Sequence, residues 1–342
     1  MAYRARLSSW LLIVAGLVLG ALPLLPAGAS AEVSTEALMT HVEEIAAEPR
    51  PIGSSENARA YLEAQLRGLG LEPEQQAVEV PDYFGRPGET VQVVNVLARI
   101  PGSDPTGAVA LVAHYDTVPA TLGANDNAAA VAVVLEVARA LQAGPALRND
   151  VILLLSDGEE PAPRYGSGAF VAAHPWAQDV AFVVNLEAAG GAGPSLLVAT
   201  SGPERWVADR YAVVPYPAAF SFLTTMTELI VGSYTDFAPF QDAGVAGVEF
   251  AYVHDPAIYH TDRDAPEAVR EASVRQHAAN ALALVREVGA ADLRSPGRAD
   301  AQTTFFTFGR WVVRYPAAVD VGVAAAAALV LAGVVTRRRA WR

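Results

Sequence analysis

The chain has 342 residues, of which 52% are hydrophobic and 18% are charged, a composition typical of a folded protein with a sizeable core. Its formal net charge of −13 argues against a nucleic-acid partner, because phosphate binding needs clustered Lys and Arg. The sequence contains no Cys, which excludes disulfides and thiolate ligands, so any metal must be held by His, Asp and Glu.

Residues 1–31 have the pattern of a secretory signal. Arg4 and Arg6 precede an apolar run over residues 10–27, and Ala29-Ser30-Ala31 follows as a small-residue cleavage site. The apolar run also nearly reaches the length of a bilayer span, so an uncleaved N-terminal membrane anchor is the alternative.

Strands and helices alternate through the middle of the chain. Helices are predicted at residues 32–48, 55–69, 127–141, 168–173, 203–211, 235–242 and 269–288. Strands are predicted at residues 90–100, 108–113, 151–155, 181–186 and 245–253. This order predicts an α/β fold with a mixed, mainly parallel central sheet flanked by helices, in one domain over residues 32–292.

The C-terminal part is expected to reach a membrane. Residues 293–316 are predicted to be a linker and interfacial segment, with Trp311 and Tyr315 at the outer interface. Residues 317–336 are predominantly apolar, and about 20 such residues suffice to cross a bilayer. The basic residues in 337–342 favour a cytoplasmic tail, which would place the domain on the extracellular or periplasmic side. The alternative for residues 317–336 is a buried, Ala-rich core helix.

Three of the predicted strands end in side chains that bind metals. His114 and Asp116 end the first, Glu159 and Glu160 follow the second, and Glu187 ends the third. Ligands of open α/β sheets bind beyond the carboxyl ends of the strands, so these side chains are expected to meet at one rim. Such a cluster suits a hard or borderline cation.

Two further residues have plausible places at the same rim. Asp126 precedes a helix and could be an ordinary N-cap, but its loop follows the His114 strand and its two oxygens could bridge two cations. His260 follows another apolar strand and is the natural last ligand. Asp116 could accept a hydrogen bond from the second ring nitrogen of His114, although a polar strand end is the simpler interpretation.

The adjacent acids Glu159 and Glu160 indicate hydrolysis. Side chains of neighbouring residues diverge outside helices, so one acid can bind metal while the other takes a proton from water. Three ligand carboxylates, with one further negative group, would nearly balance two divalent cations.

These residues carry a resemblance to a known family. The segments AHYDT, GANDN, SDGEE, NLEAAG and YHTDRD resemble metallopeptidase family twenty-eight, the co-catalytic di-zinc exopeptidases, over roughly residues 51–288. The segments GSGAFVAAHPWAQ, YTDFAPFQDAG and FFTFGRWVVRYP are similar to the endoplasmic reticulum metallopeptidase branch of that family.

The resemblance implies a zinc exopeptidase, phosphorylase/hydrolase-like fold that binds two zinc ions. It assigns His114 and Glu187 to one zinc, Glu160 and His260 to the other, Asp126 to both, Glu159 as general base and Asp116 as the residue that orients His114. It also implies a cis peptide between Asp126 and Asn127, a substrate contact at Tyr234, and support of the His260 loop by Asp264. For Asp236 it implies either a substrate contact or support of the residues around the metals. Many members of the family have Asp where Glu187 stands.

The function expected from this set is a membrane-anchored aminopeptidase that acts on peptides with a free N-terminus. A single-zinc glutaminyl-peptide cyclase and a catalytically inactive binding module are the alternatives, although the binding module should lack ligands and none is missing. The sequence leaves open the preferred N-terminal residue, the oligomeric state, and the choice between Zn, Mn and Co.

Overall fold

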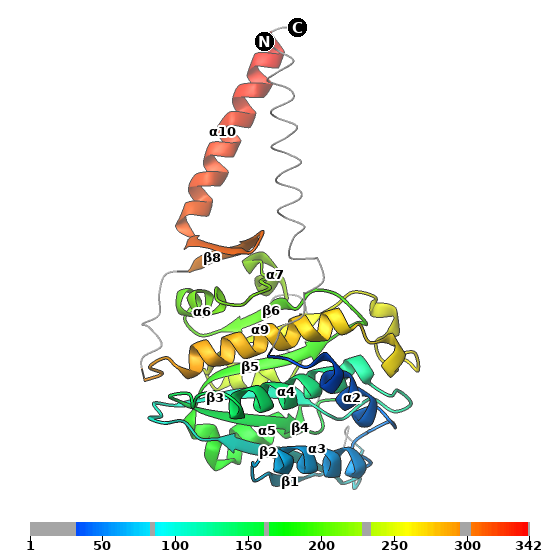
Figure 1. Ribbon diagram of the computed structural model, residues 1–342. Coiled ribbons are helices and arrows are strands. Elements are labelled where there is room, and N and C mark those ends of the chain that lie inside the picture. Colours follow the sequence, from blue (N-terminus) through cyan, green and yellow to red (C-terminus); the bar gives the residue numbers. More distant parts are fainter. Residues whose placement is uncertain (1–31, 83–85, 161–163, 228–233, 295–301, 341–342) are drawn as a thin grey trace.

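The computed structural model describes residues 32–82, 86–160, 164–227, 234–294 and 302–340 (Figure 1). The predicted signal or anchor at residues 1–31 lies outside the described residues, as do residues 341–342 of the predicted basic tail.

A seven-stranded sheet in the order β1-β2-β4-β3-β5-β7-β6 forms the centre of the domain. The strands are β1 (Glu74–Val80), β2 (Val91–Ile100), β3 (Ala108–His114), β4 (Asp150–Ser156), β5 (Val180–Ala188), β6 (Leu196–Ser201) and β7 (Ala246–Tyr252). The inner strands β4, β3, β5 and β7 run parallel, whereas β1, β2 and β6 pair antiparallel at the two sides. Every residue of β3, β4 and β7 is buried, as expected for parallel strands covered on both faces. The predicted mixed α/β sheet is confirmed.

Helices cover both faces of the sheet (Figure 1). They are α2 (Thr35–Ile45), α3 (Glu56–Gly68), α4 (Ala130–Gln142), α5 (Tyr165–Ala173), α6 (Glu204–Tyr211), α7 (Ser221–Met226), α8 (Phe237–Asp242), α9 (Glu271–Gly289) and α10 (Ala318–Ala340). The larger apolar core joins one face of the sheet to α2, α3, α4, α6 and α9. A smaller core joins the other face to α5 and α8 through Phe170 and Phe240. Because α4 is covered by both the sheet and other helices, nearly all its residues are buried.

A β-hairpin occupies the region in which the sequence predicted a linker. Strands β8 (Thr303–Phe308) and β9 (Trp311–Pro316) pair antiparallel, and Phe305 and Val312 belong to the larger core. Thr307 and Ala219 exchange two hydrogen bonds, of 2.8 and 2.9 Å, just before α7. Residues 303–316, predicted to be part of a linker and interfacial segment, instead form a strand pair, and in β8 the buried residues Thr303, Phe305 and Thr307 alternate with more exposed ones.

Helix α10 follows the hairpin and projects away from the domain (Figure 1). It overlaps the segment 317–336 that was predicted to span a membrane. Within the described part of the chain, no helix is both long enough and apolar enough to cross a bilayer.

Candidate metal centre and active site

Six side chains meet at the carboxyl ends of the parallel strands. His114 is the last residue of β3, Glu187 lies near the end of β5, and Glu159 and Glu160 follow β4. Asp126 lies in the segment Ala124–Ala129 before α4, where its backbone angles are not helical, and His260 lies in the loop after β7. Ligand atoms of these residues form three overlapping groups, each spanning at most 4.8 Å. The folded chain thus gathers the residues that the sequence placed at one rim.

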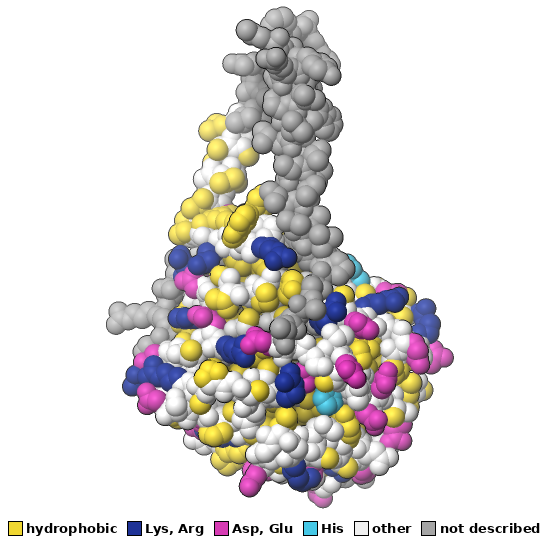
Figure 2. Space-filling view, viewed as in Figure 1, with side chains coloured by type: hydrophobic (Ala, Val, Ile, Leu, Met, Phe, Trp, Pro, Cys, Tyr) yellow, Lys and Arg dark blue, Asp and Glu magenta, His cyan; other side chains and the backbone are white. Residues whose placement is uncertain are grey.

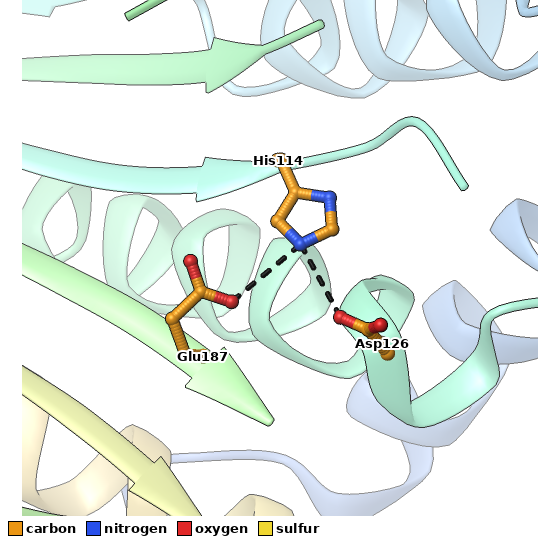
Figure 3. A group of neighbouring side chains, drawn as sticks. All are labelled: His114, Asp126 and Glu187. Atoms are coloured by element: carbon orange, nitrogen blue, oxygen red, sulfur yellow. Dashed lines mark ion pairs between the residues drawn. The ribbon is translucent and has the colours of Figure 1, made fainter. Parts of the chain in front are cut away.

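The first group surrounds the imidazole of His114. Its Nε2 lies 3.3 Å from Oδ1 of Asp126 and 3.5 Å from Oε2 of Glu187 (Figure 3). Asn127 and Asn185 donate side-chain hydrogen bonds of 3.1 and 3.2 Å to the two carboxylate oxygens of Glu187. Burial disfavours a charged imidazole, but the surrounding carboxylates, led by Glu187, outweigh it and raise the pKa of His114.

The second group surrounds His260. Its Nε2 lies 2.7 Å from Oε1 of Glu160 and 3.1 Å from Oδ2 of Asp126. The two oxygens of Asp126 therefore face different imidazoles, which is the arrangement of a bridging carboxylate. Burial would raise the pKa of Asp126, but hydrogen bonds from His114 and His260 lower it to about 2.

Asp116 holds the loop that carries the two glutamates. Its Oδ1 and Oδ2 accept hydrogen bonds from the backbone N–H groups of Glu159, at 3.2 Å, and Glu160, at 2.9 Å. Nδ1 of His114 lies 3.1 Å from the Asp116 carbonyl oxygen and 3.5 Å from Oδ1 of Asp116. The other ring nitrogen, Nε2, therefore faces Asp126 and Glu187. Asp116 thus positions three site residues, more than the single orienting contact that the sequence suggested.

The backbone before α4 is held by the last residue of β7 and by the loop that follows β7. Asp264 accepts hydrogen bonds from the backbone N–H groups of Asn125 and Asp126, at 2.8 and 3.0 Å. Tyr252 donates a 3.0 Å hydrogen bond to Oδ1 of Asn125. The Asp126–Asn127 peptide is cis, as the resemblance implied.

Arg50 is a positioning residue that the sequence reasoning missed. Its side chain is fully buried and donates hydrogen bonds to five backbone carbonyls, those of Ile45, Glu48, Tyr115, Leu122 and Gly123. These bonds fasten the segment between His114 and Asp126. Burial lowers the pKa of Arg50 to about 10, and carboxylates such as Asp116 partly offset this effect. A lone Arg in a Pro-rich break gives no periodic signal that would have marked it.

A pocket of about 990 Å³ opens at the carboxyl ends of the strands. The six side chains that meet there all line it: His114, Asp126, Glu159, Glu160, Glu187 and His260. Glu159 is only 6% exposed, and burial raises the pKa of its carboxyl. Tyr234 lines the pocket and is 58% exposed, so it can reach a bound molecule. Asp236 is fully buried, is hydrogen-bonded by the Ser156 hydroxyl, and is absent from the pocket lining. Its position fits support of the β4 end, the second of the two roles that the resemblance left open for Asp236.

The donor set fits zinc. Two imidazole Nε2 atoms and the carboxylates of Asp126, Glu160 and Glu187 are borderline and hard donors of the kind that zinc binds in proteins. Each imidazole faces carboxylate oxygens. Hydrogen bonds to protein groups already orient these residues: His114 contacts the Asp116 carbonyl, and the Asn127 amide donates to Glu187.

Fold and site together define the class of this protein as a metallohydrolase with an α/β sheet. Residues 95–285 match the model of Peptidase family M28. Because the match covers more than half of the 342 residues, the chain belongs to this family of metallopeptidases.

Several curated proteins are similar in sequence. Endoplasmic reticulum metallopeptidase 1 of Rattus norvegicus is 28% identical over 317 residues, which cover 85% of this chain and 35% of the relative. The vacuolar membrane protease of Candida dubliniensis is 30% identical over 240 residues, covering 65% of this chain and 25% of the relative. The chain thus spans about a quarter to a third of the length of these relatives.

Solved structures share the fold. A zinc aminopeptidase from Bacillus subtilis has a TM-score of 0.58 at 15% identity and covers 75% of this chain and 95% of its own. The glutaminyl cyclase of Porphyromonas gingivalis has a TM-score of 0.61 at 18% identity and covers 76% of this chain and all of its own.

Proposed function

We propose that the chain is a zinc-dependent aminopeptidase that removes N-terminal residues from peptides. The observation that carries this proposal is the shared carboxylate of Asp126, whose two oxygens lie 3.3 and 3.1 Å from the two imidazoles. Two cations could therefore be held side by side. Family membership supports peptide-bond hydrolysis, and the named aminopeptidase with the same fold supports attack at the end of a peptide.

In this proposal the ligands divide into two sets. His114 and Glu187 would hold one zinc ion, Glu160 and His260 would hold the other, and Asp126 would contribute to both. Zinc would supply Lewis-acid polarisation of the scissile carbonyl and a water molecule acidic enough to lose a proton near neutral pH.

Glu159 is the general base. It lines the pocket within the same group of ligand atoms as His114 and Glu160, but it is not needed to complete either ligand set. It accepts the proton of the attacking water and passes it to the leaving amine. The backbone bond from Glu159 N–H to Asp116 keeps its carboxyl at the rim. Tyr234, exposed at the pocket, is proposed to contact the substrate near the scissile carbonyl.

Metal quantification combined with aminoacyl reporter hydrolysis tests this function. The purified protein should hold two zinc ions per chain, lose activity on chelation and recover it with added zinc. A single zinc ion together with pyroglutamate formation from an N-terminal Gln peptide would instead establish a cyclase. Failure to bind zinc at all would leave a binding module.

We also propose that the chain is membrane-anchored, with its domain on the extracytoplasmic side. Two observations support this: one relative is named a vacuolar membrane protease, and α10 leaves the domain with Val321 and Leu329 more than two-thirds exposed. Figure 2 shows hydrophobic side chains along the described part of α10 and at its base. Trp311, the first residue of β9, is 67% exposed. Retention of the full chain in membranes after alkaline washing, and its release when residues 317–342 are removed, would test the C-terminal anchor.

A further inference from the structure

The pocket continues past the metal ligands into a chamber. Strands β6 and β7 line one side through Val198, Ala199, Glu249 and Ala251, and helices α7 and α8 line another through Leu223 and Ala238. We call this part the β7 chamber. Its volume is part of the 990 Å³ pocket that opens at the cluster, so a molecule bound at the metal ligands has direct access to it.

Glu249 lies farther along the sheet than the metal ligands. Glu187 pairs with Ala251 across β5 and β7, and Asn185 pairs with Glu249, so the side chains of all four residues share one face. On β7, Glu249 comes two residues before Ala251, the residue that pairs with Glu187, which is an offset of about 6.6 Å along the strand. An extended Lys or Arg side chain covers a comparable length from its Cα atom.

Among the residues that the structure describes, the Thr235 hydroxyl is the one side-chain donor that reaches the carboxyl of Glu249. Glu249 is 6% exposed yet faces the pocket. Burial, and then the like charge of Glu187, raise the pKa of this carboxyl to about 8. A buried carboxylate without a cation or several donors is costly, and a bound cation would remove that cost.

The surroundings suit a long side chain that ends in a positive charge. Small and aliphatic residues, among them Ala199, Ala251 and Val198, can contact methylene groups. Outside the metal cluster, the charged residues that line the described pocket are Arg164, Glu204, Asp242 and Glu249. Acidic groups thus outnumber basic ones among these lining residues.

We propose that the β7 chamber receives the side chain of the substrate's N-terminal residue, and that Glu249 selects a cationic one, Lys or Arg. The inference rests on the proposed aminopeptidase function. The substrate α-amino group would stay near the metal ligands and Glu187, while the side-chain ammonium or guanidinium reaches Glu249 and makes a charge-assisted hydrogen bond there.

The test compares aminoacyl reporters that differ in terminal charge. For the full-length zinc-loaded protein, kcat/KM for Lys and Arg reporters should exceed that for the norleucine reporter, which has the four side-chain carbons of Lys without the ammonium, by at least tenfold. Glu249→Gln keeps the size of the side chain and should remove this preference, while the norleucine value changes less than about threefold. Glu79→Gln, an exposed change on the distant strand β1, is the matched control and should keep the preference.

Binding of the free amino acids separates this inference from the proposed function. Calorimetry should show L-lysine binding the zinc-loaded protein more tightly than L-norleucine, and Glu249→Gln should abolish the difference. If no reporter is cleaved but this pattern holds, the aminopeptidase proposal fails and the chamber assignment stands. If reporters are cleaved without cation preference, or Glu249→Gln lowers Lys and norleucine hydrolysis equally in a protein with unchanged thermal unfolding, the chamber assignment is overturned.

Discussion

Oδ2 of Asp264 accepts a 3.0 Å hydrogen bond from the backbone N–H of Asp126, across 138 residues of chain. Asp264 lies in the same loop as His260, four residues further on. The loop after β7 therefore carries one proposed metal ligand, His260, and positions another, Asp126, through its backbone. The two halves of the site are thus mechanically linked before any metal binds.

Asp264→Asn should weaken zinc binding about 10- to 100-fold, the cost typical of losing support behind a metal ligand. The amide can accept fewer hydrogen bonds and would turn a donor toward the N–H groups of Asn125 and Asp126. Competition with a chromogenic chelator measures the affinity. Asp262→Asn, an exposed change in the same loop, is the control, and equal affinities for the two variants would contradict the assignment.

Glu159→Gln should retain zinc and lose about 10²- to 10⁴-fold in kcat, because the amide cannot accept the proton of the attacking water. Zinc content and steady-state hydrolysis of an aminoacyl reporter are measured on the same sample. The exposed substitution Glu267→Gln serves as the control. A Glu159→Gln protein as active as the parent would remove Glu159 from the role of base.

Arg50→Lys should lower the free energy of unfolding by on the order of 3 kcal/mol, because several buried carbonyls lose their donor. A lysine ammonium cannot reproduce the fork that contacts Tyr115 and Leu122 together. Chemical denaturation of the chelated protein measures this loss. Arg67→Lys, whose side chain is 59% exposed, should change stability by less than about 0.5 kcal/mol. Similar values for both variants would show that the Arg50 contacts contribute little.

His277 should make stability depend on pH. Burial lowers its pKa to about 3, below the ordinary value of 6.5, so the folded protein binds this proton less strongly than the unfolded chain. Its contribution is therefore fully present above about pH 6.5 and is lost as pH falls toward about 3.

His277→Gln, which can keep the contact of His277 with the Ser195 hydroxyl, should flatten this slope. Denaturation of chelated parent and variant at several pH values between 7.5 and 4 measures the difference, with chelation removing the pH dependence of metal binding. Parallel curves for the two proteins would show that His277 does not titrate on unfolding.

The sequence predicted the parallel centre of the sheet because strands such as β4 are continuous apolar runs. It missed β1, whose side chains are mostly exposed and polar at the sheet edge, and β6, whose burial is only partial. The gathering of the proposed ligand side chains at one rim followed from one rule about strand ends and from the family resemblance. Contacts between distant segments, such as those of Arg50, Asp116 and Asp264, have no local pattern from which they could be predicted.

The hairpin β8–β9 also has a practical consequence for any shortened version of the protein. Helix α7 lines the β7 chamber, and the residues just before and at its start are hydrogen-bonded to Thr307 and Phe305. Ending the chain at residue 292, where sequence composition suggests that the domain ends, would remove these hydrogen bonds to α7 and expose core side chains. Yields and cleavage preferences measured on such a shortened protein would reflect a chamber in which α7 has lost the support of β8. A chain that ends after residue 316 keeps the hairpin and its hydrogen bonds to α7.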